Sequence, residues 1–349
     1  MKRIGVLIEP LDTLFFRGGR PFGAGLKAES GLPGPQVFAG LVRTMLLEGS
    51  GADFGAMKGK GGTREAFRVA GAEWVSEVKC RGPWLAETGG GAVKPVVALP
   101  ANLQMGGEDQ VTATAPRRKA VPGWSAPGAG MLPLWSGGLS RTKGGQEWIS
   151  FEGLRRYLHG EAVRRQDLRA TAELLEWEVR TGVGIDAGTY ASKEGDLYST
   201  RAIRLKPNVS FYGEVDLPEE GAELLNDVTA WGGERHLAAV RVVEAVAWPE
   251  AAGERTVALL ASPGFFGGGW RPSGIAAGAL RGAAVKGPFA VSGWDLTRGG
   301  PKATRFGVDA GTVYFVEGGL ERGQSFGESD EDAALGYGFY LKGKWNYAE

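Results

Sequence analysis

The chain contains 349 residues, a length at which one hydrophobic core usually gives way to two lobes. Hydrophobic residues make up 43% of it and glycines number 59, which together indicate packed cores joined by long loops on a β-rich frame. A single cysteine excludes an internal disulfide and a thiolate metal site, two histidines argue against a metal centre, and the formal net charge of zero counts against a free-standing nucleic-acid binder.

The N-terminal stretch combines an apolar strand, a basic glycine loop and a helix. Residues 4–8 are apolar or glycine, and a run of this length favours a buried strand. In the following loop Arg17 and Arg20 flank two glycines, which let the backbone approach a ligand closely, while arginine forks suit phosphate. Residues 35–47 begin with proline and carry one apolar stripe at helical spacing. Arg43, near the helix end, could contact nucleic acid or cap the last carbonyl groups.

A long segment dense in glycine and proline spans residues 87–145. It contains the basic run 116–119 and two tryptophans, Trp124 and Trp135. A structureless loop of this length is usually functional or bound by a partner, although its tryptophans could equally cover the core. Before it, residues 70–81 favour a strand.

Residues 151–159 favour a short helix, and a second informative segment follows at 180–204. Two β-prone stretches there flank a polar turn at 193–195, which is the pattern of a protruding hairpin. Three arginines lie near its base: Arg180, Arg201 and Arg204. A hairpin that interrupts a nucleic-acid strand would have this pattern, and an ordinary solvent-exposed hairpin would too.

Charge is unevenly distributed along the C-terminal half. Residues 207–230 hold six acids and no base, whereas residues 264–308 hold six bases, Lys286 among them, and one acid. This segregation favours one face for a polyanion and others for protein or water, with solvated faces as the alternative.

Glycines place basic residues at two further positions. Within residues 231–236, Arg235 and His236 stand at the entrance of a predicted strand. Residues 264–272 mix aromatic rings with Arg271, as single-stranded nucleic-acid binders do, although core aromatics have the same pattern. We expect a helix at 218–227 and strands at 237–246, 283–294 and 311–316.

The chain closes with a predicted helix end, a Gly336-Tyr337-Gly338 loop and a final strand. The loop lacks a third glycine in register and a Gly-Lys-Ser or Gly-Lys-Thr motif, so it is neither a dinucleotide-binding nor a Walker loop. Its glycines could expose backbone N–H groups to a phosphate, with Lys342 and Lys344 beside them.

In their order and spacing, several of these segments resemble the RAMP superfamily of CRISPR proteins, and within it the third RAMP subunit of the type III-B, or Cmr, effector complex. The segments are residues 14–22, 35–43, 180–186, 232–235 and 336–338. The resemblance covers most of the chain and depends on the order of the motifs, since no single one is decisive.

The resemblance implies an α+β fold of two ferredoxin-like (RRM-like) βαββαβ lobes, at 1–200 and 201–349, with long Gly/Pro-rich insertions and a C-terminal glycine-rich loop at 336–343. It implies a non-catalytic crRNA-binding subunit for antiviral defence, which caps the crRNA 5′ end, holds the 5′ tag and lies near target RNA. The implied partners are the large polymerase-like subunit and backbone RAMP subunits. We expect a cytoplasmic protein without membrane contact or cofactor.

The candidate RNA-binding residues are Arg17, Arg20, Arg43, Arg180, Arg201, Arg204, Arg235, His236, Arg271, Lys286, Gly336, Gly338 and Lys342. No catalytic or metal-binding residue is expected. The sharpest alternative is a RAMP endoribonuclease that uses Asp12, since no histidine precedes His159. Asp12 could instead pair with a nearby arginine or fix a turn. Further alternatives are the equivalent tag-binding subunit of a type III-A complex and a β protein that binds carbohydrate.

Overall fold

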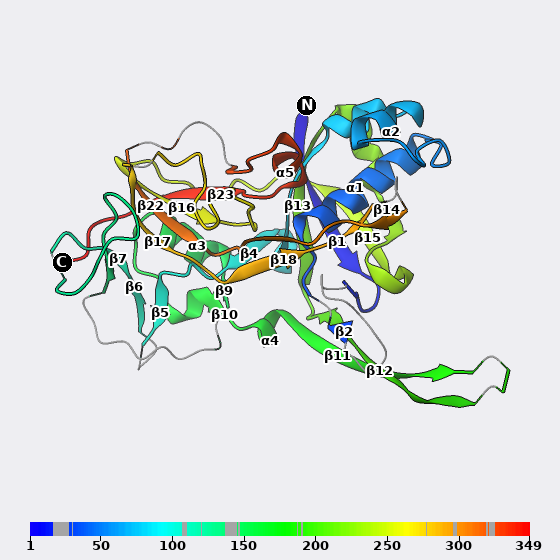
Figure 1. Ribbon diagram of the computed structural model, residues 1–349, viewed down its shortest axis with the longest axis horizontal. Helices are drawn as coiled ribbons and strands as arrows, with labels where there is room; N and C mark the ends of the chain where they lie inside the picture. The colour runs from blue at the N-terminus through cyan, green and yellow to red at the C-terminus, as the bar shows by residue number, and fades with distance from the viewer. Residues whose placement is uncertain are drawn as a thin grey trace.

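The computed structural model describes most of the chain, in mostly antiparallel sheets with short helices, an α+β arrangement. The described residues are 1–16, 28–29, 31–106, 110–119, 121–136, 145, 147–186, 188–189, 191–276, 278–295, 299–318, 320 and 325–349. Figure 1 shows an elongated molecule with the C-terminus at one end and a long hairpin at the other.

An eight-stranded sheet forms the centre of the molecule, in the order β10-β9-β4-β3-β13-β1-β15-β14. Its strands are β1 (Lys2–Pro10), β3 (Lys79–Glu87), β4 (Lys94–Ala98), β9 (Trp148–Ile149), β10 (Leu168–Arg169), β13 (Val209–Leu217), β14 (Asp227–Ala230) and β15 (Leu237–Val243). The first strand, β1, lies between β13 and β15 and is antiparallel to both. Its apolar centre is buried, which confirms the strand predicted at 4–8.

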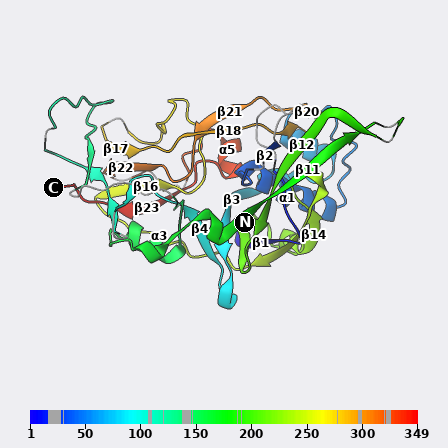
Figure 2. The ribbon, with the colours of Figure 1, turned by 90° about the horizontal axis from the view of Figure 1, so that it is seen from below.

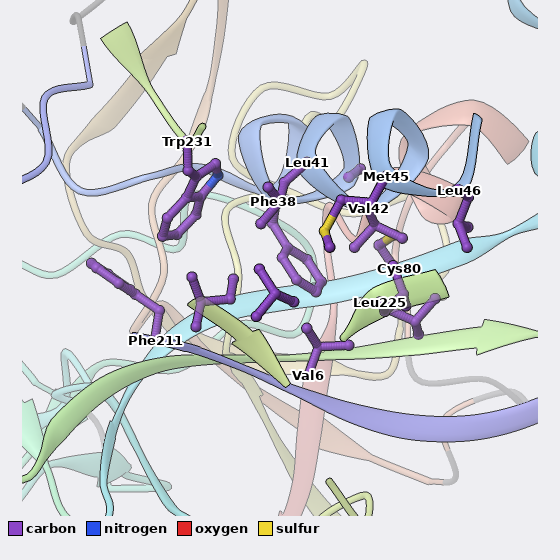
Figure 3. Close-up of a cluster of buried hydrophobic side chains, with 14 of the residues drawn as sticks. Val6, Phe38, Leu41, Val42, Met45, Leu46, Cys80, Phe211, Leu225 and Trp231 are labelled. Atoms are coloured by element: carbon purple, nitrogen blue, oxygen red, sulfur yellow. The ribbon is translucent and has the colours of Figure 1, made fainter. Parts of the chain in front are cut away.

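Helix α1 (Pro35–Gly49) covers one face of this sheet (Figure 3). Pro35 occupies the first turn, which its fixed φ suits. Phe38 and Leu46 are fully buried on the face toward β1. The ring of Phe38 lies over Gly213 of β13, where an added Cβ would be 2.3 Å from it. The helix predicted at 35–47 is therefore confirmed, and its apolar stripe is the reason that it packs here.

A second sheet has four antiparallel strands in the order β17-β22-β16-β23. They are β16 (Arg255–Leu260), β17 (Leu280–Ala284), β22 (Val313–Glu317) and β23 (Tyr340–Lys344). The strand that comes first in the chain, β16, lies between the third, β22, and the fourth, β23. The second, β17, pairs with the third. The strands β3-β13-β1-β15 of the large sheet have the same arrangement.

The two sheets share one hydrophobic cluster. Trp84 and Tyr212 from the large sheet pack in it with Phe315 and Phe339 from the second half of the chain. The ring centroids of Trp84 and Phe339 are 5.5 Å apart, and Trp84 Nε1 donates a 2.7 Å hydrogen bond to the carbonyl of Ala261. Apolar packing and a buried hydrogen bond therefore join the two sheets.

Strands β11 (Leu175–Ile185) and β12 (Ser192–Leu205) form the predicted hairpin, which projects from the body in both ribbon views (Figures 1 and 2). Its turn follows Asp186, whose Oδ1 accepts hydrogen bonds from the N–H groups of Gly188 and Thr189 at 2.9 and 3.0 Å. The turn predicted at 193–195 is wrong because those residues lie within β12. The aspartate side chain fixes the earlier turn by bonding its own backbone.

The other elements are shorter and lie around the two sheets. They are β2 (Ala28–Glu29), α2 (Thr63–Val69), β5 (Leu103–Met105), β6 (Val111–Ala113), β7 (Ala115–Pro116), β8 (Leu134–Trp135), α3 (Phe151–Leu158), α4 (Thr171–Leu174), β18 (Pro288–Val291), β19 (Trp294–Asp295), β20 (Gly300–Pro301), β21 (Arg305–Val308) and α5 (Asp330–Leu335), with short 3₁₀ helices between them. The helix α3 confirms the prediction at 151–159. None of the helices described has the length and apolarity needed to cross a membrane.

Three predicted elements differ from the structure. Residues 70–81 do not form one strand, because Glu73–Glu77 form a 3₁₀ helix that buries Val75 before β3 begins. The helix predicted at 218–227 is the 3₁₀ helix Glu219–Leu225. The single strand predicted at 283–294 is divided among the end of β17, all of β18 and the start of β19.

The large sheet contains strands from both sides of residue 200. Strands β13 and β15 pair with β1, so the large sheet continues well past residue 200, the boundary expected from the sequence. The last strand of the large sheet ends at Val243, and the first strand of the four-stranded sheet begins at Arg255.

Candidate nucleic-acid interface

A cleft of about 1040 Å³ lies between the large sheet and the segments that follow β16 and β17. Its walls come from the start of α1, from β3, from the base of the hairpin and from β18. The aromatic residues that line it are Phe16, Trp84, Trp148, Trp177, Phe211 and Phe289. Trp148, Trp177 and Phe289 are only partly buried. Arg201 already lies over the ring of Trp177, so Trp148 and Phe289 offer the ring surface on which an unpaired base can stack.

Most charges that line the cleft are already paired within the protein. Lys206 Nζ lies 2.6 Å from a carboxylate oxygen of Glu176. Glu147 accepts hydrogen bonds from the backbone N–H and the hydroxyl of Thr171. Lys286 is different, because its Nζ takes part in no ion pair among the described residues.

Lys286 lines the cleft and is half-buried. Its side chain packs against Gly311, where an added Cβ would be 2.9 Å from Lys286 Cε. Burial lowers the pKa of Lys286, while the nearby Asp309 and Glu147 act to raise it. Burial likewise raises the pKa of Asp309. Within the part of the chain that the structure describes, Lys286 Nζ has no hydrogen-bond acceptor. A phosphate or a base carbonyl entering here would supply one.

One face of the hairpin base holds a network of ion pairs. Asp12 lies 3.1 Å from Arg204 Nη2 and 3.5 Å from Arg180 Nη2. Glu178 contacts the same two arginines at 2.6 and 2.8 Å. Desolvation acts to raise the pKa of Asp12, but hydrogen bonds from Arg204, from the backbone of Thr13 and from Arg180 lower it overall. The prediction that Asp12 pairs with an arginine is confirmed, and both arginines are balanced by carboxylates.

The opposite face of the hairpin is apolar. The guanidinium of Arg201 lies 4.3 Å from the ring centre of Trp177, which lines the cleft. Further along the same face, the side chains of Val179 and Ile185 are 64% and 63% exposed. Arg201 is therefore the hairpin arginine that stands beside the cleft without a carboxylate partner in any described ion pair.

The turn at 232–236 packs against the start of the basic N-terminal loop. The N–H of Gly233 donates a 2.7 Å hydrogen bond to the carbonyl of Phe15. Gly232 has φ +88°, and an added Cβ would be 2.6 Å from the same carbonyl oxygen. Arg235 also has a positive φ, of 56°, and is exposed, while His236 Nε2 lies 3.6 Å from Glu234. This geometry brings Arg235 beside the point where the loop carrying Arg17 and Arg20 begins.

The sequence matches the family model described as CRISPR-associated protein (Cas_Cmr3) over residues 6–345. The chain belongs to this family. Two similar solved structures are a type III-B Cmr-beta complex bound to cognate target RNA (18% identity, TM-score 0.54) and the same kind of complex with target RNA and AMPPnP (17%, 0.53). Each match covers 90% of this chain and 86% of the other, and at such identities it shows the fold alone. No curated protein sequence matches this chain.

In this Cas_Cmr3 protein the terminal Gly336-Tyr337-Gly338 loop packs against its own chain. All three of its N–H groups donate to backbone carbonyls, that of Gly338 to Pro263 at 2.7 Å. An added Cβ at Gly336 would lie 2.8 Å from the carbonyl oxygen of Cys80. The glycines thus permit close packing between segments, and the prediction that the loop offers free N–H groups to a phosphate is corrected.

Of the predicted basic residues that the structure describes, only Lys286 belongs to the cleft lining, and Arg43, Arg271 and Lys342 lie elsewhere in this Cas_Cmr3 chain. Arg43 faces a separate hollow of about 1090 Å³, and its buried Nε has no acceptor there. Arg271 Nη2 donates to the carbonyl of Ile275 at 3.2 Å, within its own loop. Lys342 Nζ lies 5.9 Å from the centre of the Tyr340 ring. Arg17 and Arg20 lie outside the described residues of the chain.

The sequence did not indicate several cleft residues of the Cas_Cmr3 chain, notably Trp177, Phe289 and Asp309. Trp177 carries a readable signal, because it alternates with Val179 on the apolar face of the predicted hairpin. Phe289 and Asp309 come together from β18 and from the segment after β21, far from α1 in sequence. No local pattern marks that meeting.

Proposed function

We propose that this chain is the crRNA-binding subunit of a type III-B RNA-targeting effector complex and holds the crRNA 5′ tag without cutting it. Membership of the Cas_Cmr3 family supports a role in CRISPR defence. The observation that carries the proposal is the aromatic cleft lined by Lys286, whose Nζ has no hydrogen-bond acceptor among the residues that the structure describes. Partly exposed rings suit splayed bases, and the cation suits the backbone or a base edge.

The cations around the cleft suggest how the strand would run. Lys286 lines the cleft, and Arg201 lies over the ring of Trp177, another lining residue. Arg235, next to Phe15, would continue the contact toward the N-terminal loop, where Arg17 and Arg20 remain predicted phosphate contacts. Arg180 and Arg204 contribute less, because Asp12 and Glu178 already neutralise them.

We also propose that both sheets are ferredoxin-like lobes. In the large sheet, β1, α1, β3, β13, a 3₁₀ helix and β15 follow one another with the strand order of a βαββαβ fold. The second sheet repeats that order, with α5 between its third and fourth strands. The described residues between β16 and β17 form a loop where the first helix of such a lobe would lie.

Within the proposed complex, the large polymerase-like subunit and the backbone RAMP subunits would be protein neighbours. The acids of the segment 207–230 support such contacts, since Glu219, Glu220 and Glu223 are exposed on one 3₁₀ helix. Negative patches of this kind suit a basic protein surface better than RNA.

The proposal includes a non-catalytic role. Asp12 is the acid nearest the basic loop in sequence, and the two arginines that bind it lower its pKa. A carboxylate stabilised in its ionised form is a poor proton acceptor for ribonuclease chemistry. Incubation with labelled repeat RNA and target RNA tests this role: cleavage that disappears in Asp12→Asn would show that the chain is an endoribonuclease.

Replacement of Lys286 tests the cleft. We expect Lys286→Ala to weaken binding of tag-containing crRNA by about tenfold or more, because a charge-assisted hydrogen bond contributes about 1.5–3 kcal/mol. The slope of log affinity against log salt should become shallower by about 0.7 for each phosphate group that the variant no longer binds. Filter binding across a salt series measures both quantities.

Lys302→Ala is the matched control, since Lys302 is exposed, belongs to the same basic segment and does not line the cleft. If both variants bind crRNA as the parent does, the cleft is not the RNA site.

A further inference from the structure

Arginines stack on aromatic rings at the end of the molecule that carries the C-terminus, opposite the hairpin (Figure 1). The guanidinium of Arg117 lies 4.5 Å from the ring centre of Trp135, and that of Arg118 lies 4.0 Å from the ring centre of Tyr347. Arg255 approaches the same Tyr347 ring at 5.3 Å. We refer to Arg117, Arg118, Lys119, Trp135 and Tyr347 as the arginine–aromatic patch.

The backbone holds this patch in place. Strands β7 and β8 pair beside β17, and the N–H of Arg117 donates to the carbonyl of Pro133 at 2.9 Å. The C-terminal segment joins them, because the N–H of Ala348 donates to the carbonyl of Pro116 at 3.0 Å. Gly282 of β17 leaves room for the Leu134 side chain, because a Cβ added at Gly282 would lie 2.9 Å from that side chain. The patch is thus built on paired backbone from three parts of the chain.

Within the part of the chain that the structure describes, the patch has more positive charge than nearby carboxylates balance. Residues 110–136 contain three bases and no acid. Glu317, the carboxylate that Arg118 approaches at 3.6 Å, already accepts hydrogen bonds from Arg281 at 2.6 Å and from the Tyr347 hydroxyl at 2.7 Å. Among the described residues, Arg117 and Lys119 have no carboxylate in ion-pair range.

We propose that the arginine–aromatic patch binds a carboxylate-rich surface of a neighbouring protein subunit. A guanidinium held flat on a ring keeps its N–H edge free for bidentate contact with a carboxylate, at a reduced entropic cost. Tryptophan, tyrosine and arginine are also the residues that dominate protein–protein interfaces. Trp135 is 40% exposed, so a partner would cover further apolar surface.

The same geometry favours protein over RNA at this patch. Bases bind to open ring faces, but Arg117 and Arg118 already lie over the rings of Trp135 and Tyr347. The patch also shares no residue with the cleft lining, so an RNA held in the cleft does not require it. This inference rests on the proposed function, because the expected partners are the other protein subunits of the proposed type III-B assembly.

The test uses the full-length chain and the other protein subunits encoded with it, each purified and treated with nuclease. Association is measured by biolayer interferometry, and crRNA affinity is measured separately on the same preparations. The variant is the double substitution Arg118→Glu with Lys119→Glu. The control is Arg64→Glu, because the Arg64 and Arg118 side chains are 72% and 69% exposed and each approaches one glutamate.

We expect the double variant to weaken binding of one protein subunit by about tenfold or more, since opposed like charges cost several kcal/mol, and to leave crRNA affinity unchanged. Arg64→Glu should change neither quantity. Unchanged binding of every subunit that binds the parent chain overturns the inference alone. A loss of crRNA affinity with protein binding intact also overturns it and assigns the patch to RNA. If the parent chain binds no subunit, the proposed assembly fails together with the inference.

Discussion

Glu214 shows how a single buried charge can tie stability to pH. Its side chain, on β13, is 1% exposed and accepts hydrogen bonds from Trp248 Nε1 at 2.7 Å and from the Tyr212 hydroxyl at 3.2 Å. Arg81 Nη1 lies 3.6 Å from its other oxygen, which has no hydrogen-bond donor among the residues that the structure describes. Burial raises the pKa of Glu214 despite these partners. Removal of the carboxylate from water destabilises its ionised form by more than the hydrogen bonds and the nearby arginine stabilise it.

The raised pKa predicts a loss of stability as pH rises. Between the ordinary glutamate pKa of about 4.3 and the higher folded value, the folded state binds more protons than the unfolded state, so stability falls with increasing pH. Glu214→Gln removes this titration, and we expect its free energy of unfolding to decline less between pH 4.5 and 7 than that of the parent. Urea unfolding at several pH values measures the difference.

Glu223→Gln, at an exposed position, is the control for general charge effects. Equal pH slopes for Glu214→Gln and the parent would show that Glu214 carries no linked proton.

At the residue scale, the sequence predicted chemical types better than partners. Basic and aromatic residues were expected at an RNA site, and Lys286 does line the cleft. That Asp12 neutralises Arg204 depends on residues 192 positions apart, and no local pattern encodes such a contact. The place of Phe289 in the cleft was likewise not predictable, because it depends on the pairing of β18 with β21.

At the element scale, the terminal glycine loop joins α5 to β23 and fastens both to the large sheet. Gly336 has φ +97° and is the left-handed cap that ends α5. The Tyr337 side chain, 1% exposed, reaches Gln36 of α1 with its hydroxyl at 3.2 Å from Oε1. Ser262 Oγ donates to the carbonyl of Gly336 at 2.6 Å. The loop therefore connects both halves of the chain.

Alanine substitution separates the two reasons for glycine in this loop. Gly336→Ala places a Cβ in left-handed backbone and 2.8 Å from the Cys80 carbonyl oxygen, whereas Gly59→Ala, at φ +72°, meets nothing within 4 Å. We expect Gly59→Ala to cost about 1–2 kcal/mol of unfolding free energy and Gly336→Ala to cost clearly more. Urea denaturation of both variants gives the comparison. Equal losses would mean that the contact with β3 relaxes freely.

Elements with a clear period were predictable, and irregular ones were not. The apolar spacing of α1 and the two β-prone stretches of the hairpin predicted the right type of element and its approximate bounds. The 3₁₀ helix at Glu73–Glu77 was missed because one turn is too short to establish a period, and its buried Val75 resembles a strand residue. The turn at Asp186 was missed because Lys193 to Gly195 looked equally polar.

At the scale of the whole molecule, one residue that lines the cleft, Trp84, also belongs to the hydrophobic cluster shared by the two sheets. Trp84 lines the cleft and at the same time packs with Phe339 and Trp248, with ring centroids 5.5 and 4.8 Å apart. The two sheets are therefore expected to unfold together, since neither buries this cluster alone.

Thermal unfolding tests this coupling. We expect circular dichroism and tryptophan fluorescence to report one coincident transition. Trp84→Ala should lower the free energy of unfolding by about 3–5 kcal/mol, as large-to-small changes in cores do. Trp124→Ala, at a 40% exposed position, should have little effect. Two separate transitions in the parent chain would show that the sheets are independent.

The composition of the large sheet could not be read from the sequence, because it depends on which strands pair. The strands of residues 209–243 return to β1 across the hairpin and the long loop. Only the pairing of β1 with β13 and β15 reveals that return.

The single cysteine is a natural probe for local opening of the fold. Cys80 is fully buried on β3 beneath α1, with its carbonyl against Gly336, and burial raises its pKa to about 12 (Figure 3). A thiol reagent can modify it only while this part of the fold is open, so the labelling rate counts opening events without any engineered probe. If RNA or a partner subunit holds the two halves of the chain together, the thiol reagent should modify the Cys80 sulfur more slowly.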